Sequence, residues 1–315
     1  MRSLIERTTG KSQQTGDEPA AGSPRRRCAR GIVDNPKAVR LDDGRLVGYA
    51  DCGDPDGDPL VLCHGFPNSR VFGALFDPAA RDLGVRVVAP ERPGIGVSDP
   101  DPDRELTDWP TDLAAVTEAL DLDRFGVLGI SGGAPYALVS AAMLPGLVER
   151  VGVASGLGPM AAVGLREQLW YKTARHLSPL TKLALLVGDR RARKDRDAFL
   201  SGIADGSAPA DHPLWTGEVG AVIYDSMIEA RRRHGLDPLD RETAIYGSPW
   251  GFDLDEVDVP VALWYGKADS VVPPGMGWYL SEHLPTATAQ FYPDLGHLST
   301  FVRHESEILR TVALA

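Results

Sequence analysis

The sequence predicts an α/β protein built on a mostly parallel β-sheet that is covered by helices on both faces. Two observations predict this fold: short apolar runs recur along the chain, and helical patterns separate them. Apolar runs without alternation are typical of parallel strands buried on both faces. Strands that alternate with helices along a chain usually pair as a parallel sheet. A length of 315 residues suffices for one large α/β domain with an insertion.

The order of elements starts with an N-terminal segment, residues 1–34, that is rich in Ser, Gly, Gln, Thr and Pro and is predicted to be disordered. A β-hairpin follows, in which Asp42-Asp43-Gly44 forms the turn between two short strands. The predicted strands, hairpin included, are 38–41, 45–50, 60–63, 85–89, 125–128, 151–154, 261–265 and 289–292. Helices are predicted at 113–120 and 137–144, between the buried strands.

The alternation of strands and helices stops between Gly156 and Asp255. Helical patterns fill this stretch at 165–176, 180–187 and 219–232, together with Trp170, Trp215 and Trp250. A helical segment of this size between two strands of one sheet indicates a cap inserted over a site, and the alternative is a separate small domain. The predicted organisation is therefore a core of residues 35–155 and 256–315 with a helical cap at 156–255.

Composition excludes several classes of protein. The chain has 33 Lys and Arg against 44 Asp and Glu, a formal net charge of −11, which disfavours a nucleic-acid partner because phosphates require a basic surface. No apolar run approaches the roughly 20 residues of a membrane helix, and the first 31 residues lack the apolar segment of a secretion signal. The three cysteines have no metal-binding spacing, so we expect free thiols, no metal and a cytoplasmic protein.

The motif with the clearest chemistry is Gly129-Ile130-Ser131-Gly132-Gly133, which follows a predicted strand and precedes a predicted helix. This is a G-x-S-x-G elbow in the strand–turn–helix context that it requires. The tight turn strains the serine backbone and needs small neighbours. The serine hydroxyl then lies at the N-terminus of the next helix, where developing negative charge is stabilised. The sequence therefore predicts Ser131 as a nucleophile.

A serine nucleophile needs a base and a carboxylate that orients the base. His297 lies in a Gly-led loop after the last predicted strand, and Asp269 follows the strand that ends at Tyr265. The order Ser131, Asp269, His297 differs from both main serine-protease orders. Asp294 and Asp253 are weaker substitutes for Asp269, because the first is too close to His297 in sequence and the second lies where the cap ends.

Acyl transfer also needs two N–H groups that stabilise an oxyanion. Gly132, next after the nucleophile, supplies one of them. The segment Cys63-His64-Gly65-Phe66-Pro67-Asn68 follows the first buried strand, and its turn can direct the Phe66 N–H to the same place. His64 is expected to hold this loop by hydrogen bonds rather than to act in catalysis.

These motifs together resemble the α/β-hydrolase fold superfamily. The resemblance rests on His64-Gly65-Phe66-Pro67, the segment 91–98, the Ser131 elbow, Asp269 and Gly296-His297, and it spans about residues 38 to 315. It implies an eight-stranded sheet with a cap between the sixth and seventh strands. The segment 91–98 is interpreted as structural, since its Gly-x-Gly lacks the third glycine of a dinucleotide site.

Related subgroups leave the reaction open. Epoxide hydrolases and haloalkane dehalogenases share His-Gly-Phe-Pro but use an Asp nucleophile, so Ser131 argues against both. Proline iminopeptidases usually have Gly-Gly-Ser-Trp-Gly, from which this elbow departs. We expect a serine hydrolase that forms an acyl-enzyme with a small or medium apolar ester, without cofactor. The alternatives are carbon–carbon bond or lactone hydrolysis, perhydrolysis, or a non-catalytic ligand receptor.

Overall fold

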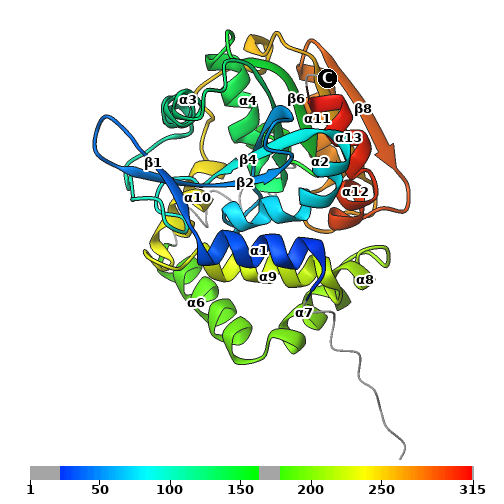
Figure 1. The fold of residues 1–315 in the computed structure, drawn as a ribbon. Coiled ribbons are helices and arrows are strands. Elements are labelled where there is room, and N and C mark those ends of the chain that lie inside the picture. The colour runs from blue at the N-terminus through cyan, green and yellow to red at the C-terminus, as the bar shows by residue number, and fades with distance from the viewer. Residues whose placement is uncertain (1–21, 163–177, 314–315) are drawn as a thin grey trace, which may run out of the picture.

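The computed structural model describes residues 22–162 and 178–313, and in it eight strands form one sheet (Figure 1). The strands are β1 (Lys37–Arg40), β2 (Leu46–Gly53), β3 (Asp58–Cys63), β4 (Val85–Pro90), β5 (Phe125–Ile130), β6 (Val148–Ala154), β7 (Val261–Gly266) and β8 (Ala287–Tyr292). Their order is β1-β2-β4-β3-β5-β6-β7-β8, in which the β1–β2 and β2–β4 pairs are antiparallel and the other five pairs are parallel. The predicted α/β fold with an eight-stranded, mostly parallel sheet is confirmed.

Helices cover both faces of the sheet, and alternate residues of the central strands pack into two different apolar clusters. In β3, Leu60 and Leu62 belong to one apolar cluster, whereas Val61 and Cys63 belong to the other. The first cluster includes α2 (Asp77–Leu83), α12 (His297–Arg303) and α13 (Glu305–Val312), and the second includes α3 (Trp109–Ala119), α4 (Ala134–Met143) and α11 (Pro274–His283). Since neither face of the central strands meets water, β3 to β7 appear in the sequence mainly as apolar runs, whereas the edge strands β1 and β8 are largely exposed.

The predicted N-terminal disordered segment is wrong from Pro24 onward, and residues 1–21 lie outside the described residues. Helix α1 spans Pro24–Asp34, with a proline at its first position. Ala29 is buried in the first cluster, and Cys28, Ile32 and Val33 pack against it. The segment is rich in arginine, so its composition resembles that of a disordered tail. Its few apolar residues form a narrow helix face that is buried only by packing on the rest of the protein.

The described part of the chain between β6 and β7 is mainly helical. It contains α6 (Ser178–Lys194), α7 (Arg196–Asp205), α8 (His212–Trp215), α9 (Glu218–Glu229) and α10 (Asp237–Tyr246). The predicted helices at 180–187 and 219–232 correspond to α6 and α9, while the one at 165–176 and Trp170 lie outside the described residues. Trp215 and Trp250 are buried in the two clusters. The assignment of this segment as a cap stays a prediction.

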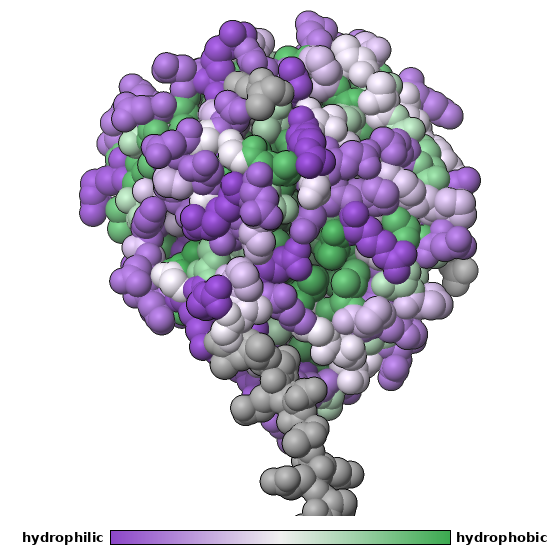
Figure 2. All heavy atoms as spheres, turned by 45° about the vertical axis from the view of Figure 1, so that its right-hand side comes forward, coloured by the Kyte–Doolittle hydropathy of each residue, from purple (hydrophilic) through white to green (hydrophobic). Residues whose placement is uncertain are grey.

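Short 3₁₀ turns complete the connections: η1 (Arg70–Leu75), η2 (Leu106–Asp108), η3 (Ser131–Gly133), η4 (Met160–Ala162) and η5 (Leu254–Glu256). Polar side chains cover most of the face in Figure 2, with apolar residues in smaller groups between them. Across the two described ranges, no helix combines the length and the apolar character needed to cross a membrane.

Arg70 of η1 is fully buried and lies between two buried glutamates. Its Nη1 donates to Glu91 Oε1 at 2.7 Å, and its Nη2 lies 2.9 Å from Glu229 Oε1 of α9. Nη2 also donates to the carbonyl of Ile32 in α1 at 3.2 Å. One guanidinium therefore joins the loop after β4 to both α9 and α1, and these two helices lie side by side in Figure 1.

Glu242 of α10 is the centre of a second buried network. Its carboxylate lies 2.7 Å from Arg92 Nε and accepts a 2.5 Å hydrogen bond from Arg104. The hydroxyls of Tyr136 and Tyr246 each donate to it at 2.7 Å. Burial alone would raise the pKa of the Glu242 carboxyl, but the two guanidinium charges outweigh burial and lower the pKa to about 2. The carboxylate is therefore charged at neutral pH.

We predict that Arg70→Met lowers the free energy of unfolding by about 3–5 kcal/mol, because two glutamates lose their buried countercharge. Urea denaturation followed by tryptophan fluorescence measures the loss. The matched control is Arg124→Met, since Arg124 pairs with Glu149 at the surface and its side chain is 66% exposed. The control should change stability by less than about 1 kcal/mol, and equal losses in the two variants would contradict the prediction.

We predict that stability depends on pH through Glu242. A folded-state pKa of about 2 against an ordinary value of 4.5 stabilises the fold above pH 4.5, and this stabilisation is lost as the pH falls toward 2. The full contribution is on the order of 3 kcal/mol. The free energy of unfolding should therefore fall more steeply below pH 4.5 for the unmodified chain than for Glu242→Gln. Parallel pH profiles from urea denaturation would contradict this expectation.

Candidate active site

Ser131 lies at the turn between β5 and α4, as the sequence predicts. It is the first residue of η3, and its φ of 53° is in the left-handed region that non-glycine residues seldom adopt. The turn is tightly packed, because a Cβ built on Gly133 would lie 1.9 Å from the carbonyl oxygen of Cys63. The elbow thus places Ser131, which is 9% exposed, at the N-terminal end of α4. Position 133 must be a glycine because the backbone of another segment lies too close for a Cβ.

Asp269 and His297 are in direct contact. Asp269 Oδ2 lies 2.8 Å from His297 Nδ1, and Asp269 Oδ1 accepts the backbone N–H groups of Val271 and Val272 at 2.8 and 2.9 Å. These two N–H bonds fix the carboxylate in the loop after β7. A neutral imidazole that faces a carboxylate through Nδ1 carries its proton there, which leaves Nε2 as an acceptor. The pair can therefore hold a base in one tautomer and one orientation.

Ser131 is linked to His297 through the three residues that follow β6. The Ser155 hydroxyl donates to the His297 carbonyl at 3.0 Å, and the Leu157 N–H donates to the Ser131 carbonyl at 3.0 Å. No hydrogen bond joins Ser131 to His297 in the part of the chain that the structure describes. The structure thus brings Asp269 and His297 into contact and attaches Ser131 to the same short segment, without a serine–histidine bond.

The two predicted oxyanion residues are neighbours. A Cβ built on Gly132 lies 3.0 Å from Phe66 Cβ, and one built on Gly65 lies 3.2 Å from Ser131 Cβ. The Gly132 N–H is in the first turn of η3, where backbone donors have no partner within a helix. The Phe66 N–H donates to no acceptor among the residues in the described ranges. Two backbone donors are therefore available beside Ser131.

His64 is buried behind this loop. Its carbonyl accepts a 2.7 Å hydrogen bond from Arg92, and its Nδ1 lies 3.0 Å from the Gly65 carbonyl. Burial and the neighbouring Arg92 charge lower the pKa of His64 well below its ordinary value. The imidazole is therefore neutral, and its contacts are those of a residue that holds the loop.

Sequence reasoning missed Asp211, which approaches the site from the loop between α7 and α8. It is 1% exposed, and its carboxylate accepts the N–H groups of Leu298 and Ser299 at 3.2 and 2.8 Å. These residues form the first turn of α12, which begins with His297. A Cβ built on Gly296 would lie 2.5 Å from Asp211 Oδ2, which explains why a glycine precedes His297. No local pattern could have revealed a contact between residues so far apart in sequence.

Tyr246 of α10 was also missed. Its hydroxyl lies 2.7 Å from a Cβ built on Gly132, and its ring meets that of Phe66 edge to face at 5.9 Å. The same hydroxyl donates to Glu242. The aromatic wall beside the predicted oxyanion position therefore comes from a helix that lies between β6 and β7.

Among the described residues, the side chains with spacing suited to a metal are Cys28, Cys52 and Asp77. None of them is a predicted site residue. Ser131, His297 and Asp269 are of the residue types that can transfer protons and acyl groups when they are aligned.

Comparisons with known proteins show which sequences resemble this chain. The family model for the alpha/beta hydrolase fold matches residues 58–179, a range that includes Phe66 and the Ser131 elbow. A non-heme chloroperoxidase from Streptomyces lividans is 28% identical over 269 residues, which cover 82% of this chain and 92% of the relative. A probable proline iminopeptidase from Streptomyces coelicolor is 36% identical over 130 residues, which cover 37% of this chain and 39% of the relative.

Solved structures show the same fold. An esterase from Exiguobacterium antarcticum superposes with a TM-score of 0.65 at 17% identity, covering 88% of this chain and 97% of its own. A bromoperoxidase from Bacillus anthracis superposes with a TM-score of 0.66 at 21% identity, covering 88% of this chain and 99% of its own. The sheet order, the serine elbow and these matches together show that the chain has the α/β-hydrolase fold.

Proposed function

We propose that the chain is a serine hydrolase that cleaves a small or medium carboxylic ester through an acyl-enzyme. Ser131 is the nucleophile, His297 the base and Asp269 the residue that orients His297. The observation that carries the proposal is the 2.8 Å contact between Asp269 and His297, in which the other carboxylate oxygen is fixed by two backbone N–H groups. The strained backbone of Ser131 at the start of α4 supports it.

In this mechanism Ser131 Oγ attacks the ester carbonyl carbon and its proton passes to His297 Nε2. The N–H groups of Phe66 and Gly132 stabilise the oxyanion, and His297 then protonates the leaving alcohol. Water enters, gives a proton to His297 and attacks the acyl-enzyme, which releases the acid and restores Ser131. These steps need no cofactor. The histidine–serine hydrogen bond forms when substrate binds, because such bonds are often long before the substrate complex.

An apolar or aromatic substrate is favoured by the walls of the site. The rings of Phe66 and Tyr246 flank the predicted oxyanion position, and apolar walls with a few polar groups are typical of small-molecule sites. A second candidate, perhydrolysis, is favoured by the non-heme chloroperoxidase that aligns with 82% of this chain. In that reaction hydrogen peroxide replaces water as the acceptor of the acyl group, so formation of a peracid from peroxide and a short carboxylic acid distinguishes it.

We predict that a fluorophosphonate probe labels the unmodified chain and fails to label Ser131→Ala. The control is Ser201→Ala, an exposed serine of α7 that should leave labelling unchanged. Hydrolysis of a chain-length series of p-nitrophenyl esters should fall by about 10⁴-fold or more in Ser131→Ala. A lactone and an aryl amide assayed beside the esters identify the bond that is cleaved. Equal labelling of both variants would contradict the role of Ser131.

We predict that Asp211→Ala lowers kcat by about 10- to 100-fold with little change in KM, because the first turn of α12 loses its acceptor and His297 moves. The rate of fluorophosphonate labelling should fall in parallel, since it depends on the same base. Asp205→Ala is the matched control, as Asp205 is exposed at the end of α7. An increase in KM at unchanged kcat would show that Asp211 supports substrate binding instead.

A further inference from the structure

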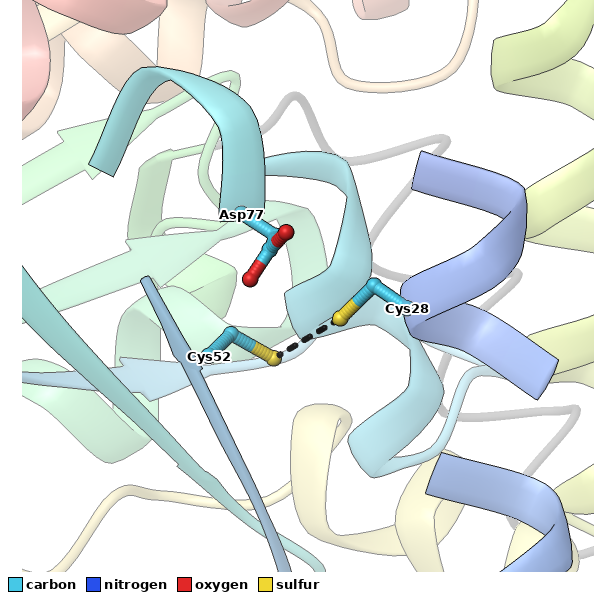
Figure 3. A group of neighbouring side chains, drawn as sticks. All are labelled: Cys28, Cys52 and Asp77. Atoms are coloured by element: carbon cyan, nitrogen blue, oxygen red, sulfur yellow. Dashed lines mark hydrogen bonds between the residues drawn. The ribbon is translucent and has the colours of Figure 1, made fainter. Parts of the chain in front are cut away.

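Helix α1 and strand β2 each present one cysteine to the other. The sulfur of Cys28 donates a hydrogen bond to the sulfur of Cys52 at 3.7 Å, and Figure 3 shows the two side chains facing each other between α1 and β2. Cys52 is 2% exposed, whereas Cys28 is half-buried at the edge of the same apolar cluster. Asp77 of α2 lies beside them, with ligand atoms of all three residues within 4.8 Å of one another.

A metal ion fits this group less well than a reaction between the thiols. The Asp77 carboxylate already accepts the Gly53 N–H at 2.9 Å and two hydrogen bonds from Arg81 at 3.1 and 3.2 Å. The carboxylate oxygens of Asp77 are therefore already occupied by hydrogen bonds, and its charge is already paired with Arg81. Two sulfur ligands are too few for structural zinc, which is almost always four-coordinate. The chemistry that remains to a close pair of thiols is formation of a disulfide.

We propose that Cys28 and Cys52 are a site of thiol–disulfide exchange that closes an intramolecular disulfide upon reaction with a small organic disulfide such as oxidised glutathione. Cys28 reacts first, because it is the less buried residue of the pair. Closing the bond requires the sulfurs to move from 3.7 Å to about 2.05 Å. Side-chain rotation of the half-buried Cys28 is the simplest route for this movement.

The exchange balances in two steps. The Cys28 thiolate attacks one sulfur of the organic disulfide and forms a mixed disulfide, and one organic thiolate leaves. The Cys52 thiolate then attacks the Cys28 sulfur, and the second organic thiolate leaves. The protons of the two cysteine thiols end on the two organic thiols. The hydrogen bond that Cys52 shares with Cys28, together with burial, raises the pKa of the Cys52 thiol, in accord with Cys52 as the second thiol to react.

The disulfide would fasten α1 to the sheet. Apart from side-chain packing, α1 is held by contacts such as Arg25 Nε to the Leu75 carbonyl at 2.8 Å and Arg232 to the Val33 carbonyl at 3.3 Å. A covalent link between residues 28 and 52 restricts the unfolded chain and prevents α1 from detaching locally. Since α1 also packs on α9, the link would hold one face of the segment between β6 and β7 in place.

The test uses the full chain incubated with oxidised glutathione and, separately, kept reduced. After denaturation the reduced chain should show three free thiols and the oxidised chain one, and a proteolytic digest should contain a peptide pair linked through Cys28 and Cys52. The midpoint of thermal unfolding should rise by several degrees, on the order of 5 °C, on oxidation. This rise should be absent in both Cys28→Ser and Cys52→Ala, the first of which alters only a half-buried position.

Four results would overturn the proposal. A stable mixed disulfide at Cys28 without the linked peptides would show that Cys52 does not complete the exchange. Persistence of three free thiols, or a link that involves Cys63, would exclude the pair as the reactive site. Tight binding of one zinc ion by the reduced chain, lost in both cysteine variants and blocking oxidation, would assign the pair to a metal instead. None of these readouts depends on ester hydrolysis, so failure here leaves the proposed function untouched.

Discussion

Two buried networks of arginine and glutamate join the sheet to the helices between β6 and β7. In each network the arginines come from the core, as Arg70 or as Arg92 and Arg104, and a glutamate comes from α9 or α10. A buried charge that loses its partner destabilises the fold. The arginines of the core and the glutamates of α9 and α10 therefore each depend on the other. The helices are therefore docked in one position, and the loops after β3 and β4 that carry Phe66 and Arg92 are fixed with them.

The candidate site depends on this docking. Ser131, Asp269 and His297 follow strands of the core, and the carboxyl ends of parallel strands meet at one edge of a sheet. Asp211 and Tyr246, however, reach the site from the docked helical segment. The core supplies the three candidate catalytic side chains. The hydrogen bonds at the start of α12 and the aromatic wall beside Gly132 form only where the helical segment packs on the core.

Much of the site could be predicted because its parts follow local rules. The elbow around Ser131 has a glycine pattern imposed by short-range packing, and Asp269 and His297 each follow a strand whose end could be read from the sequence. Asp211 could not be found in this way, since it contacts α12 across 87 residues of chain. The same holds for α1, because its few apolar residues are recognisable as a buried face only from their packing on the core.

The sequence by itself determined the strands, the fold class and the order of the candidate catalytic residues, because apolar periodicity and turn chemistry are local properties. Only the tertiary structure decided which charges would be neutralised, which carboxylate would cap the helix of His297, and that Cys28 would meet Cys52. Those contacts join residues that no spacing rule connects. Their energies arise from burial and from hydrogen bonds, which exist only once distant segments have packed together.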